Sequence, residues 1–137
     1  RGLGLHAASG YVCRQLHSHH TLDQHVLTLT PRLLQAGCSK VYISSRKAKA
    51  CDEAVEALNA LPNKRPGAKA IAVPADNSKM SELDRLVAEV SKTTDHVDIL
   101  LANAGATWGE SFDKYPESAF SKVMDLNVKS VFYLIQK

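Results

Sequence analysis

Short runs of β-type residues alternate with longer runs of helical periodicity from residue 41 to residue 137, and this alternation constrains the fold more than any other feature. Residues 41–44 predict a strand, and residues 48–61 predict a helix that Pro62 ends. A strand followed by a helix and then by another strand is typical of βαβ units. The sequence therefore predicts an α/β protein with a doubly wound parallel sheet.

Further elements continue this alternation. Residues 70–73 predict a second strand, and the run Ser81-Glu82-Leu83-Asp84 predicts a capping box at the start of the next helix. Residues 97–101 predict a third strand, which is apolar throughout, as expected where helices cover both faces of a sheet. We expect these three strands to be adjacent. Residues 117–136 then predict a long helix with one apolar side, formed by Phe120, Met124, Val128, Val131 and Ile135.

Composition restricts the class of protein. The chain holds 45% hydrophobic and 23% charged residues, which is ordinary for a soluble globular protein, and its apolar runs are shorter than the roughly 18 residues that a membrane span needs. The cysteines Cys13, Cys38 and Cys51 are odd in number and lack CxxC spacing, so we expect a reducing, cytoplasmic location. The formal net charge is +3, but the basic residues are spread out with few aromatic residues between them, so we expect no nucleic-acid partner.

Polar residues follow each predicted strand at the point where it ends. The first strand is followed by the run Ser44-Ser45-Arg46-Lys47, the second by Asp76 and the third by the run Asn103-Ala104-Gly105. Open parallel sheets bind ligands beyond the carboxyl ends of their strands, so we expect Arg46, Asp76 and Asn103 along one edge. An NAD site carries an acidic residue after such a strand to bind the ribose 2′-OH, whereas the hydroxyls and cations here suit a 2′-phosphate. The alternative is that Arg46 and Lys47 are a solvated helix start, although cations are slightly unfavourable at a helix N-terminus.

These motifs, with Asn127 inside the last predicted helix, occur in an order that resembles the classical short-chain dehydrogenase/reductases, especially the β-ketoacyl-(acyl carrier protein) reductases. The resemblance covers residues 31–137 and implies a Rossmann-like domain, here incomplete, that binds NADP. It implies that Asn127 is the active-site asparagine, which holds a water in the proton relay. The implied cofactor-binding residues are Ser45, Arg46, Lys47, Asp76, Asn103, Ala104 and Gly105.

Each implied role has a structural alternative. Asp76 would contact the adenine amino group, or it serves only as a loop or N-cap acid. Residues 103–105 would line the adenosine side of the cleft, where Gly105 permits a close approach, or they form a plain turn. Asn127 is either the active-site residue or a buried structural one, because asparagine has only modest propensity for a helix interior.

The resemblance also implies an activity. It is that of an oxidoreductase, specifically a ketoreductase, which transfers hydride between NADPH and a small-molecule carbonyl or secondary alcohol. The implied parent protein is a homo-oligomer with no membrane partner. Because a fold alone does not settle a function, the alternative is a non-catalytic remnant or binding module that keeps a Rossmann-like scaffold.

Two parts of the family pattern are missing from the sequence. No glycine lies within residues 19–26, where the family spacing places a glycine-rich phosphate-binding turn, and Gly2-Leu3-Gly4 has no strand ahead of it. The family's catalytic serine and Tyr-x-x-x-Lys segment do not follow. We therefore expect a fragment, inactive alone, with an atypical segment at residues 1–30 and a partial NADP-binding domain at residues 31–137. The alternative is that residues 25–30 form a replacement first strand.

One further pattern imitates the missing segment. Tyr133 and Lys137 form a literal Tyr-x-x-x-Lys, with Ser121 upstream. All three lie in one predicted helix with Asn127 between Ser121 and Tyr133, whereas in the family the asparagine precedes the serine. We therefore expect no catalytic role for this group.

A histidine-rich segment near the start of the chain contains ligand types that bind zinc, because imidazole and thiolate are both zinc ligands. Its spacing matches no standard structural zinc site, so we predict solvated histidines and no metal. The residues concerned are Cys13, His17, His19, His20, Asp23 and His25.

Overall fold

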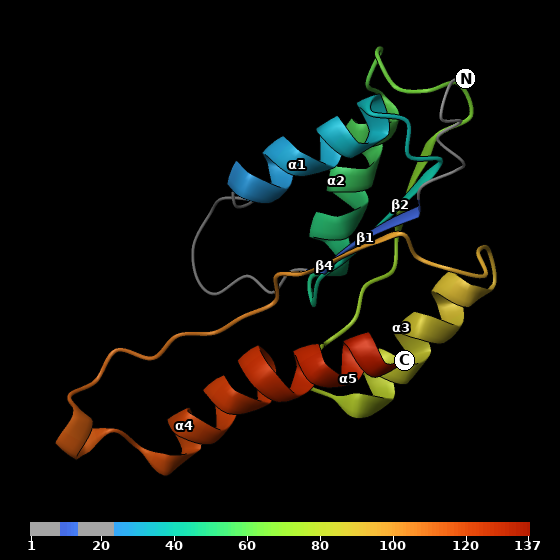
Figure 1. Ribbon diagram of the computed structural model, residues 1–137. Coiled ribbons are helices and arrows are strands. Elements are labelled where there is room, and N and C mark those ends of the chain that lie inside the picture. The colour runs from blue at the N-terminus through green and yellow to red at the C-terminus, as the bar shows by residue number, and fades with distance from the viewer. Residues whose placement is uncertain (1–8, 14–23) are drawn as a thin grey trace, which may run out of the picture.

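The computed structural model describes residues 9–13 and 24–137, which form a parallel sheet with helices on both faces (Figure 1). The strand order in the sheet is β3-β2-β1-β4, and every pairing in it is parallel. The predicted α/β class with a parallel sheet is therefore confirmed. The main elements are β1 (Ser9–Cys13), α1 (Gln24–Gln35), β2 (Lys40–Ser44), α2 (Ala48–Asn59), β3 (Lys69–Ala72), α3 (Met80–Ser91), β4 (Ile99–Ala102), α4 (Glu117–Met124) and α5 (Ser130–Gln136).

Strand β1 lies between β2 and β4, which corrects the predicted strand order. Tyr11 of β1 is opposite Tyr42 of β2 on one side and Leu100 of β4 on the other. Strands β2 and β3 are adjacent as predicted, but β4 neighbours neither of them. The alternative first strand at residues 25–30 is wrong, because these residues belong to α1.

Helices α1 and α2 cover one face of the sheet, and α3 and α5 cover the other (Figure 1). Side chains alternate along β2 between these two cores, as the pleat of a strand requires. Val41 and Ile43 join the α1–α2 core, while Tyr42 joins the α3–α5 core. The largest wholly buried aliphatic side chains are Leu34 in the first core and Leu83, Leu86 and Leu126 in the second.

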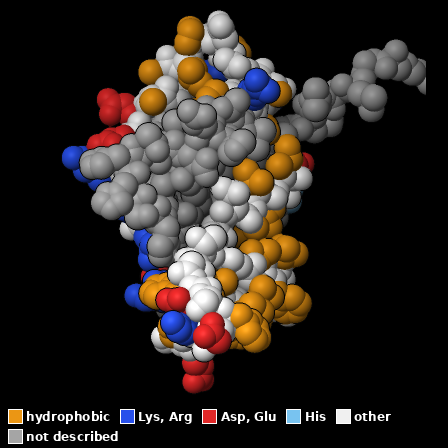
Figure 2. Space-filling view, turned by 90° about the vertical axis from the view of Figure 1, so that its left-hand side faces the viewer, with side chains coloured by type: hydrophobic (Ala, Val, Ile, Leu, Met, Phe, Trp, Pro, Cys, Tyr) orange, Lys and Arg blue, Asp and Glu red, His pale blue; other side chains and the backbone are white. Residues whose placement is uncertain are grey.

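Strand β4 forms an edge of the sheet and is more exposed than predicted. Ile99 and Leu100 are 42% and 39% exposed, so the expectation that helices cover both faces of this strand is wrong for the described part of the chain. The last helical run also turns a different side inward, because it buries Ala119, Leu126, Ser130 and Leu134. Hydrophobic side chains therefore remain on the surface (Figure 2), and they include Phe120, Met124, Val128 and Ile135 of the predicted apolar side.

Helix α3 does not begin with the predicted capping box. It begins at Met80, and Lys79 occupies the N-cap without a side-chain hydrogen bond. The turn before it is ordered by Asp76 instead, whose Oδ1 accepts hydrogen bonds from the Ser78 hydroxyl at 2.7 Å and from the Ser78 amide at 3.2 Å. This is an Asx turn, in which a carboxylate side chain takes the place of a backbone acceptor.

The helix predicted over residues 117–136 is divided by a π-helical turn, η2 (Asp125–Lys129), between α4 and α5. Helix α1 runs across the predicted domain boundary at residue 30, and the division of the chain at that point stays a prediction. Among residues 9–13 and 24–137, no helix combines the length and apolar composition that crossing a membrane requires.

Candidate functional site

The backbone register gathers the predicted site residues at one edge of the sheet. Cys13 at the end of β1 is opposite Ser44 on β2 and Ala102 on β4. Beyond β3, the Ala75 amide donates to the Ser45 carbonyl at 3.1 Å, which holds the segment before Asp76 beside the end of β2. The carboxyl ends of all four strands thus point the same way. Arg46, Asp76 and Asn103 lie along this edge, as predicted.

The two serines after β2 contribute less to the surface than their hydroxyls suggested. Ser44 is wholly buried, and Ser45 is 7% exposed. The Ser45 hydroxyl accepts a hydrogen bond from the Lys47 amide at 3.3 Å, so it shapes the turn into α2. Arg46 and Lys47 are the exposed residues of this run, and any contact with an anion would rest on them.

The start of α2 adds to the positive character of this edge. Lys47 occupies the N-cap in an extended conformation and makes no side-chain hydrogen bond to the first turn. The amide groups of a first helical turn carry partial positive charge, which attracts anions. Close behind this turn, burial raises the pKa of the Cys51 thiol, whose Sγ lies 3.8 Å from the Ser45 carbonyl oxygen. Cys51 is therefore a packed core thiol rather than a reactive one.

Asp76 performs the structural task that sequence reasoning left as an alternative. Besides the two bonds from Ser78, its main-chain oxygen accepts a hydrogen bond from the Lys79 amide at 3.0 Å. Its Oδ2 is 3.9 Å from the Lys79 ammonium group. Asp76 therefore organises the turn between β3 and α3, and a contact with adenine remains a prediction.

The segment after β4 is held by Asn127 from the long helical run. The Asn127 Oδ1 accepts a hydrogen bond from the Ala106 amide at 2.7 Å, and its Nδ2 donates to the Ala106 carbonyl at 2.9 Å. A side-chain amide carries two N–H donors and an oxygen with two lone pairs, so one donor and one acceptor position remain after this pairing. Asn127 is exposed, and the suggestion of a buried structural residue is wrong.

Gly105 is explained by this pairing rather than by its own backbone angles. A Cβ at Gly105 would lie 3.3 Å from the Asn127 Oδ1, which is closer than most side-chain contacts allow. Its φ is not in the left-handed region, so conformational freedom is not the reason for a glycine here. The close approach that Gly105 permits is therefore an approach by the Asn127 side chain.

The π-helical turn is the feature that sequence reasoning missed. Its five residues, Asp125–Lys129, place Asn127 at the centre of a widened turn. Such turns are rare and are frequent at functional sites. The only signal in the sequence was an asparagine in a helix interior, and that signal does not distinguish a π turn from a regular one.

The Tyr-x-x-x-Lys imitation does not assemble into a catalytic group. Tyr133 packs against the α3–α5 core and makes an edge-to-face contact with Phe132 at a ring-centre distance of 5.3 Å. The Lys137 ammonium group contacts the carboxylate of Asp84 on α3. Ser121 lies exposed on α4, two helical segments away. No catalytic role for these three residues is supported.

Within residues 9–13 and 24–137, no group of three metal-ligating side chains is found. The predicted histidine-rich segment lies mostly outside the described residues. The described side chains of the first strand and first helix do not extend to Cys13 or His25.

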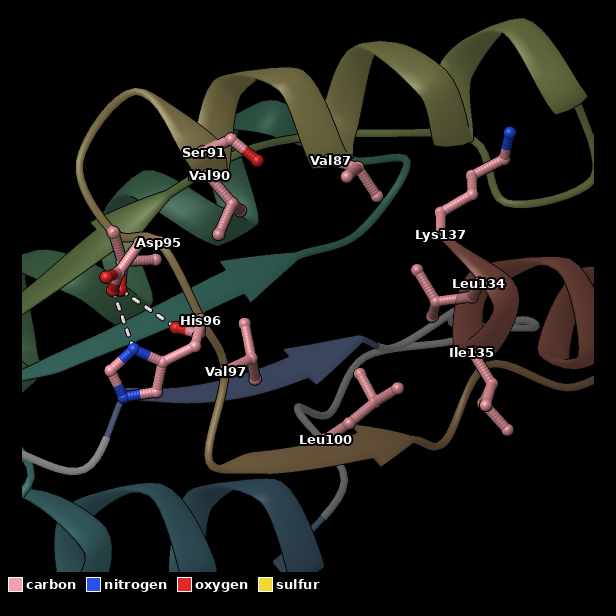
Figure 3. Close-up of a pocket in the computed structure, with 11 residues that line it drawn as sticks. Val87, Val90, Ser91, Asp95, His96, Val97, Leu100, Leu134, Ile135 and Lys137 are labelled. Carbon is pink, nitrogen blue, oxygen red and sulfur yellow. Dashed lines mark hydrogen bonds and ion pairs between the residues drawn. The ribbon is translucent and has the colours of Figure 1, made fainter.

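A hollow of about 280 Å³ lies at the opposite end of β4 from the strand-end edge (Figure 3). Val90 of α3, Leu100 of β4 and Leu134 of α5 line it, and His96 stands at its rim. A hydrogen bond with Asp95, at 2.6 Å, and the charges of Asp95 and Asp98 raise the pKa of His96. None of the predicted cofactor-binding residues lines this hollow, so it is separate from the candidate site.

Residues 27–137 match the family described as short chain dehydrogenase. The chain therefore belongs to this family. It is 39% identical over 105 residues to the rhamnolipids biosynthesis 3-oxoacyl-[acyl-carrier-protein] reductase of Pseudomonas aeruginosa, a match that covers 77% of this chain and 38% of that protein. It is 36% identical over 108 residues to the 2-dehydro-3-deoxy-D-gluconate 5-dehydrogenase of Escherichia coli, covering 76% of this chain and 38% of that protein.

Solved structures show the same fold. The RhlG/NADP active-site complex of Pseudomonas aeruginosa superposes with a TM-score of 0.76 and 32% identity, covering 96% of this chain and 46% of that one. A short-chain dehydrogenase/reductase mutant of Serratia marcescens superposes with a TM-score of 0.72 and 21% identity, covering 93% of this chain and 48% of that one, and this likeness concerns the fold alone. The chain thus spans less than half the length of these relatives.

Proposed function

We propose that this chain forms the adenosine-binding part of an NADP(H)-dependent reductase that transfers hydride between NADPH and a carbonyl or secondary alcohol. The observation that carries the proposal is the pair of exposed cations, Arg46 and Lys47, directly after β2. A site that prefers NAD places an acidic residue there to bind the ribose 2′-OH. The names of two similar proteins support the proposal, since one is a 3-oxoacyl-[acyl-carrier-protein] reductase and the other is an NADP complex.

The described residues fit the adenosine half of this cofactor. Arg46 and Lys47 would bind the 2′-phosphate, because charge-assisted hydrogen bonds to phosphate are among the strongest that side chains make. Asp76 would accept from the adenine amino group, and residues 103–105 would lie beside the adenosine. When bound, the nicotinamide would supply the hydride chemistry, and the protein would supply orientation.

Asn127 would act at the same edge in two ways. Its paired amide holds the backbone at Ala106, which follows the residues proposed to line the adenosine. Its remaining N–H and lone pair, on an exposed side chain, are available to hold a water. The second task is the one that the resemblance implies, and it would place a proton carrier close to the reacting group.

The binding half of this proposal is tested by a pair of ligands that differ only at the 2′ position. Adenosine 2′,5′-bisphosphate and adenosine 5′-monophosphate would be titrated by calorimetry, and NADPH and NADH would then be compared in the same way. We expect the 2′-phosphorylated ligand of each pair to bind more tightly. Arg46→Asp should remove that preference, a loss of roughly ten- to a hundredfold for hydrogen bonds to a charged group.

A matched substitution separates the specific effect from a change of net charge. Lys69, an exposed cation at the first position of β3, lies at the other end of that strand. Lys69→Asp alters the charge by the same amount and should leave the preference intact. Equal binding of both members of each ligand pair by the unmodified protein would contradict the 2′-phosphate role.

The absence of glycine between β1 and α1 favours a second candidate, a binding module without catalytic activity. Residues 14–23 contain none of the glycines that admit a pyrophosphate to a helix N-terminus. We expect no measurable NADPH oxidation with a panel of ketones by this polypeptide, because positioning is worth roughly 7 to 11 kcal/mol of barrier and general acid catalysis about a hundred- to ten-thousandfold in rate. Activity that Tyr133→Phe and Lys137→Ala both abolish would contradict this expectation and restore those residues as catalytic.

A further inference from the structure

The π-helical turn around Asn127 displaces one backbone hydrogen bond, and Ser130 lies where the bond is lost. In a regular α-helix the Ser130 amide would donate to the Leu126 carbonyl, four residues back. Here it donates to the Asp125 carbonyl, five residues back. The Leu126 carbonyl therefore loses its regular amide donor at a position where Leu126 is only 1% exposed.

The hydroxyl of Ser130 takes over the displaced carbonyl. Its Oγ donates to the Leu126 oxygen at 2.5 Å, and Ser130 itself is 2% exposed. A buried carbonyl left without a donor is costly, and water has little access here. Serine is one of the few side chains short enough to donate to the carbonyl four residues earlier in the same helix.

We propose that Ser130 is a positioning residue, whose hydroxyl stabilises the π-helical turn and thereby keeps the Asn127 amide directed at the backbone of Ala106. The chain of contacts is continuous. Ser130 satisfies Leu126, the widened turn presents Asn127, and Asn127 binds both polar groups of Ala106. The importance of this edge for a ligand rests on the proposed function, whereas the contacts themselves do not.

The chain contains a built-in reference for testing this inference. The Ala106 amide donates to the Asn127 side chain, and the Ala70 amide donates to the Asn59 side chain at 2.9 Å in a similar pairing elsewhere in the fold. Global opening accelerates hydrogen exchange at both amides, whereas loss of the π-helical turn accelerates it only at Ala106. The ratio of the two exchange rates therefore isolates the role of Ser130 from general stability.

The experiment is amide hydrogen exchange, followed by NMR in the complete protein without ligand. Ser130→Ala should raise the ratio of Ala106 to Ala70 exchange roughly tenfold, as expected for an unsatisfied buried acceptor. Ser130→Thr should restore the ratio, because a threonine hydroxyl can bond the same carbonyl within a helix. Ser121→Ala, at an exposed serine of α4, is the matched control and should leave the ratio unchanged.

A double substitution tests whether Ser130 acts through Asn127. Asn127→Ala alone should raise the same ratio, and adding Ser130→Ala should raise it no further, since residues that act in series are not additive. If Ser130→Ala does not fold well enough for a spectrum, Ser130→Cys, with a weakly donating thiol, should give an intermediate ratio. Equal acceleration at both amides, an unchanged ratio, or additive effects would overturn the inference. A failure to bind adenosine 2′,5′-bisphosphate would overturn only the proposed function.

Discussion

Two asparagines in this protein make the same pair of hydrogen bonds in different surroundings. Asn59 at the end of α2 accepts from the Ala70 amide at 2.9 Å and donates to the Ala70 carbonyl at 3.0 Å. Asn127 in the π-helical turn binds Ala106 with distances of 2.7 Å and 2.9 Å. Each side chain thus occupies both polar groups of one backbone residue.

The surroundings of the two pairings differ in what they demand of the chain. Ala70 lies on β3, an edge strand, and Asn59 binds the polar groups that another strand would otherwise pair. That arrangement uses a regular helix end. The pairing at Asn127 needs a π-helical turn, a hydroxyl at Ser130 and a glycine at position 105. An unusual backbone is retained only where the structure around it compensates, and such places are concentrated at functional sites.

The largest effect on stability should come from removing the Asn127 side chain. Asn127→Ala leaves the amide and the carbonyl of Ala106 without their partners, at a cost of about 2 to 4 kcal/mol in the free energy of unfolding. Urea denaturation followed by circular dichroism measures this cost. Asn63→Ala, at an exposed residue between α2 and β3, should change it by less than about 0.5 kcal/mol. A similar small change for Asn127→Ala would mean that the pairing adds little.

Gly105→Ala should be the next most costly substitution, at about 1 to 2 kcal/mol, because the new methyl group displaces the Asn127 amide. Gly109→Ala is the matched control, since a Cβ there would have no neighbour within 4 Å. Combined with Asn127→Ala, Gly105→Ala should cost much less than it does alone, because the group that it displaces is gone. Fully additive costs in a double-mutant cycle would show that the methyl group acts elsewhere.

Asn59→Ala should cost less than Asn127→Ala, about 1 kcal/mol, because the released groups of Ala70 lie at the sheet edge and water can replace part of what is lost. Alanine also has higher helix propensity than asparagine, which offsets a few tenths of a kcal/mol. The same denaturation series measures this value. A cost equal to that of Asn127→Ala would remove the energetic difference between the two pairings.

The smallest effect should come from the amino-terminal end of β4, away from both pairings. The hydrogen bond with Asp95 raises the pKa of His96 above its ordinary value of 6.5. A raised pKa stabilises the fold while histidine is protonated, and the contribution is lost as pH rises through the folded-state pKa. The difference in melting temperature between the protein and His96→Gln should therefore shrink as pH rises past this range. Because His96 is exposed, the difference stays small, and one that grows with pH would contradict this sign.

Sequence reasoning predicted the elements whose pattern is local. The strands near Val41, Ile71 and Ile99 and their connecting helices follow from hydrophobic periodicity, and the common edge of Arg46, Asp76 and Asn103 follows from parallel pairing. The family relationship was also recognised from the order of these motifs, and it is confirmed.

Features that depend on contacts between distant residues could not be predicted in this way. Strand β1 has no sustained alternation, and its place between β2 and β4 is set by pairing with both of them. The π-helical turn depends on where Ala106 lies, 21 residues before Asn127. The predicted capping box failed because Asp76, outside the helix, had already ordered the turn before α3.

The account holds that the Asn127 pairing serves a ligand edge, while the Asn59 pairing serves stability alone. The most direct test is calorimetric titration of adenosine 2′,5′-bisphosphate into Asn127→Ala and Asn59→Ala, under conditions where both variants are folded. We expect Asn127→Ala to weaken binding about tenfold, because only molecules with an ordered edge bind the ligand, and Asn59→Ala to stay within about twofold of the unmodified protein. Equal weakening in both variants, or an unchanged affinity in Asn127→Ala, would contradict the account.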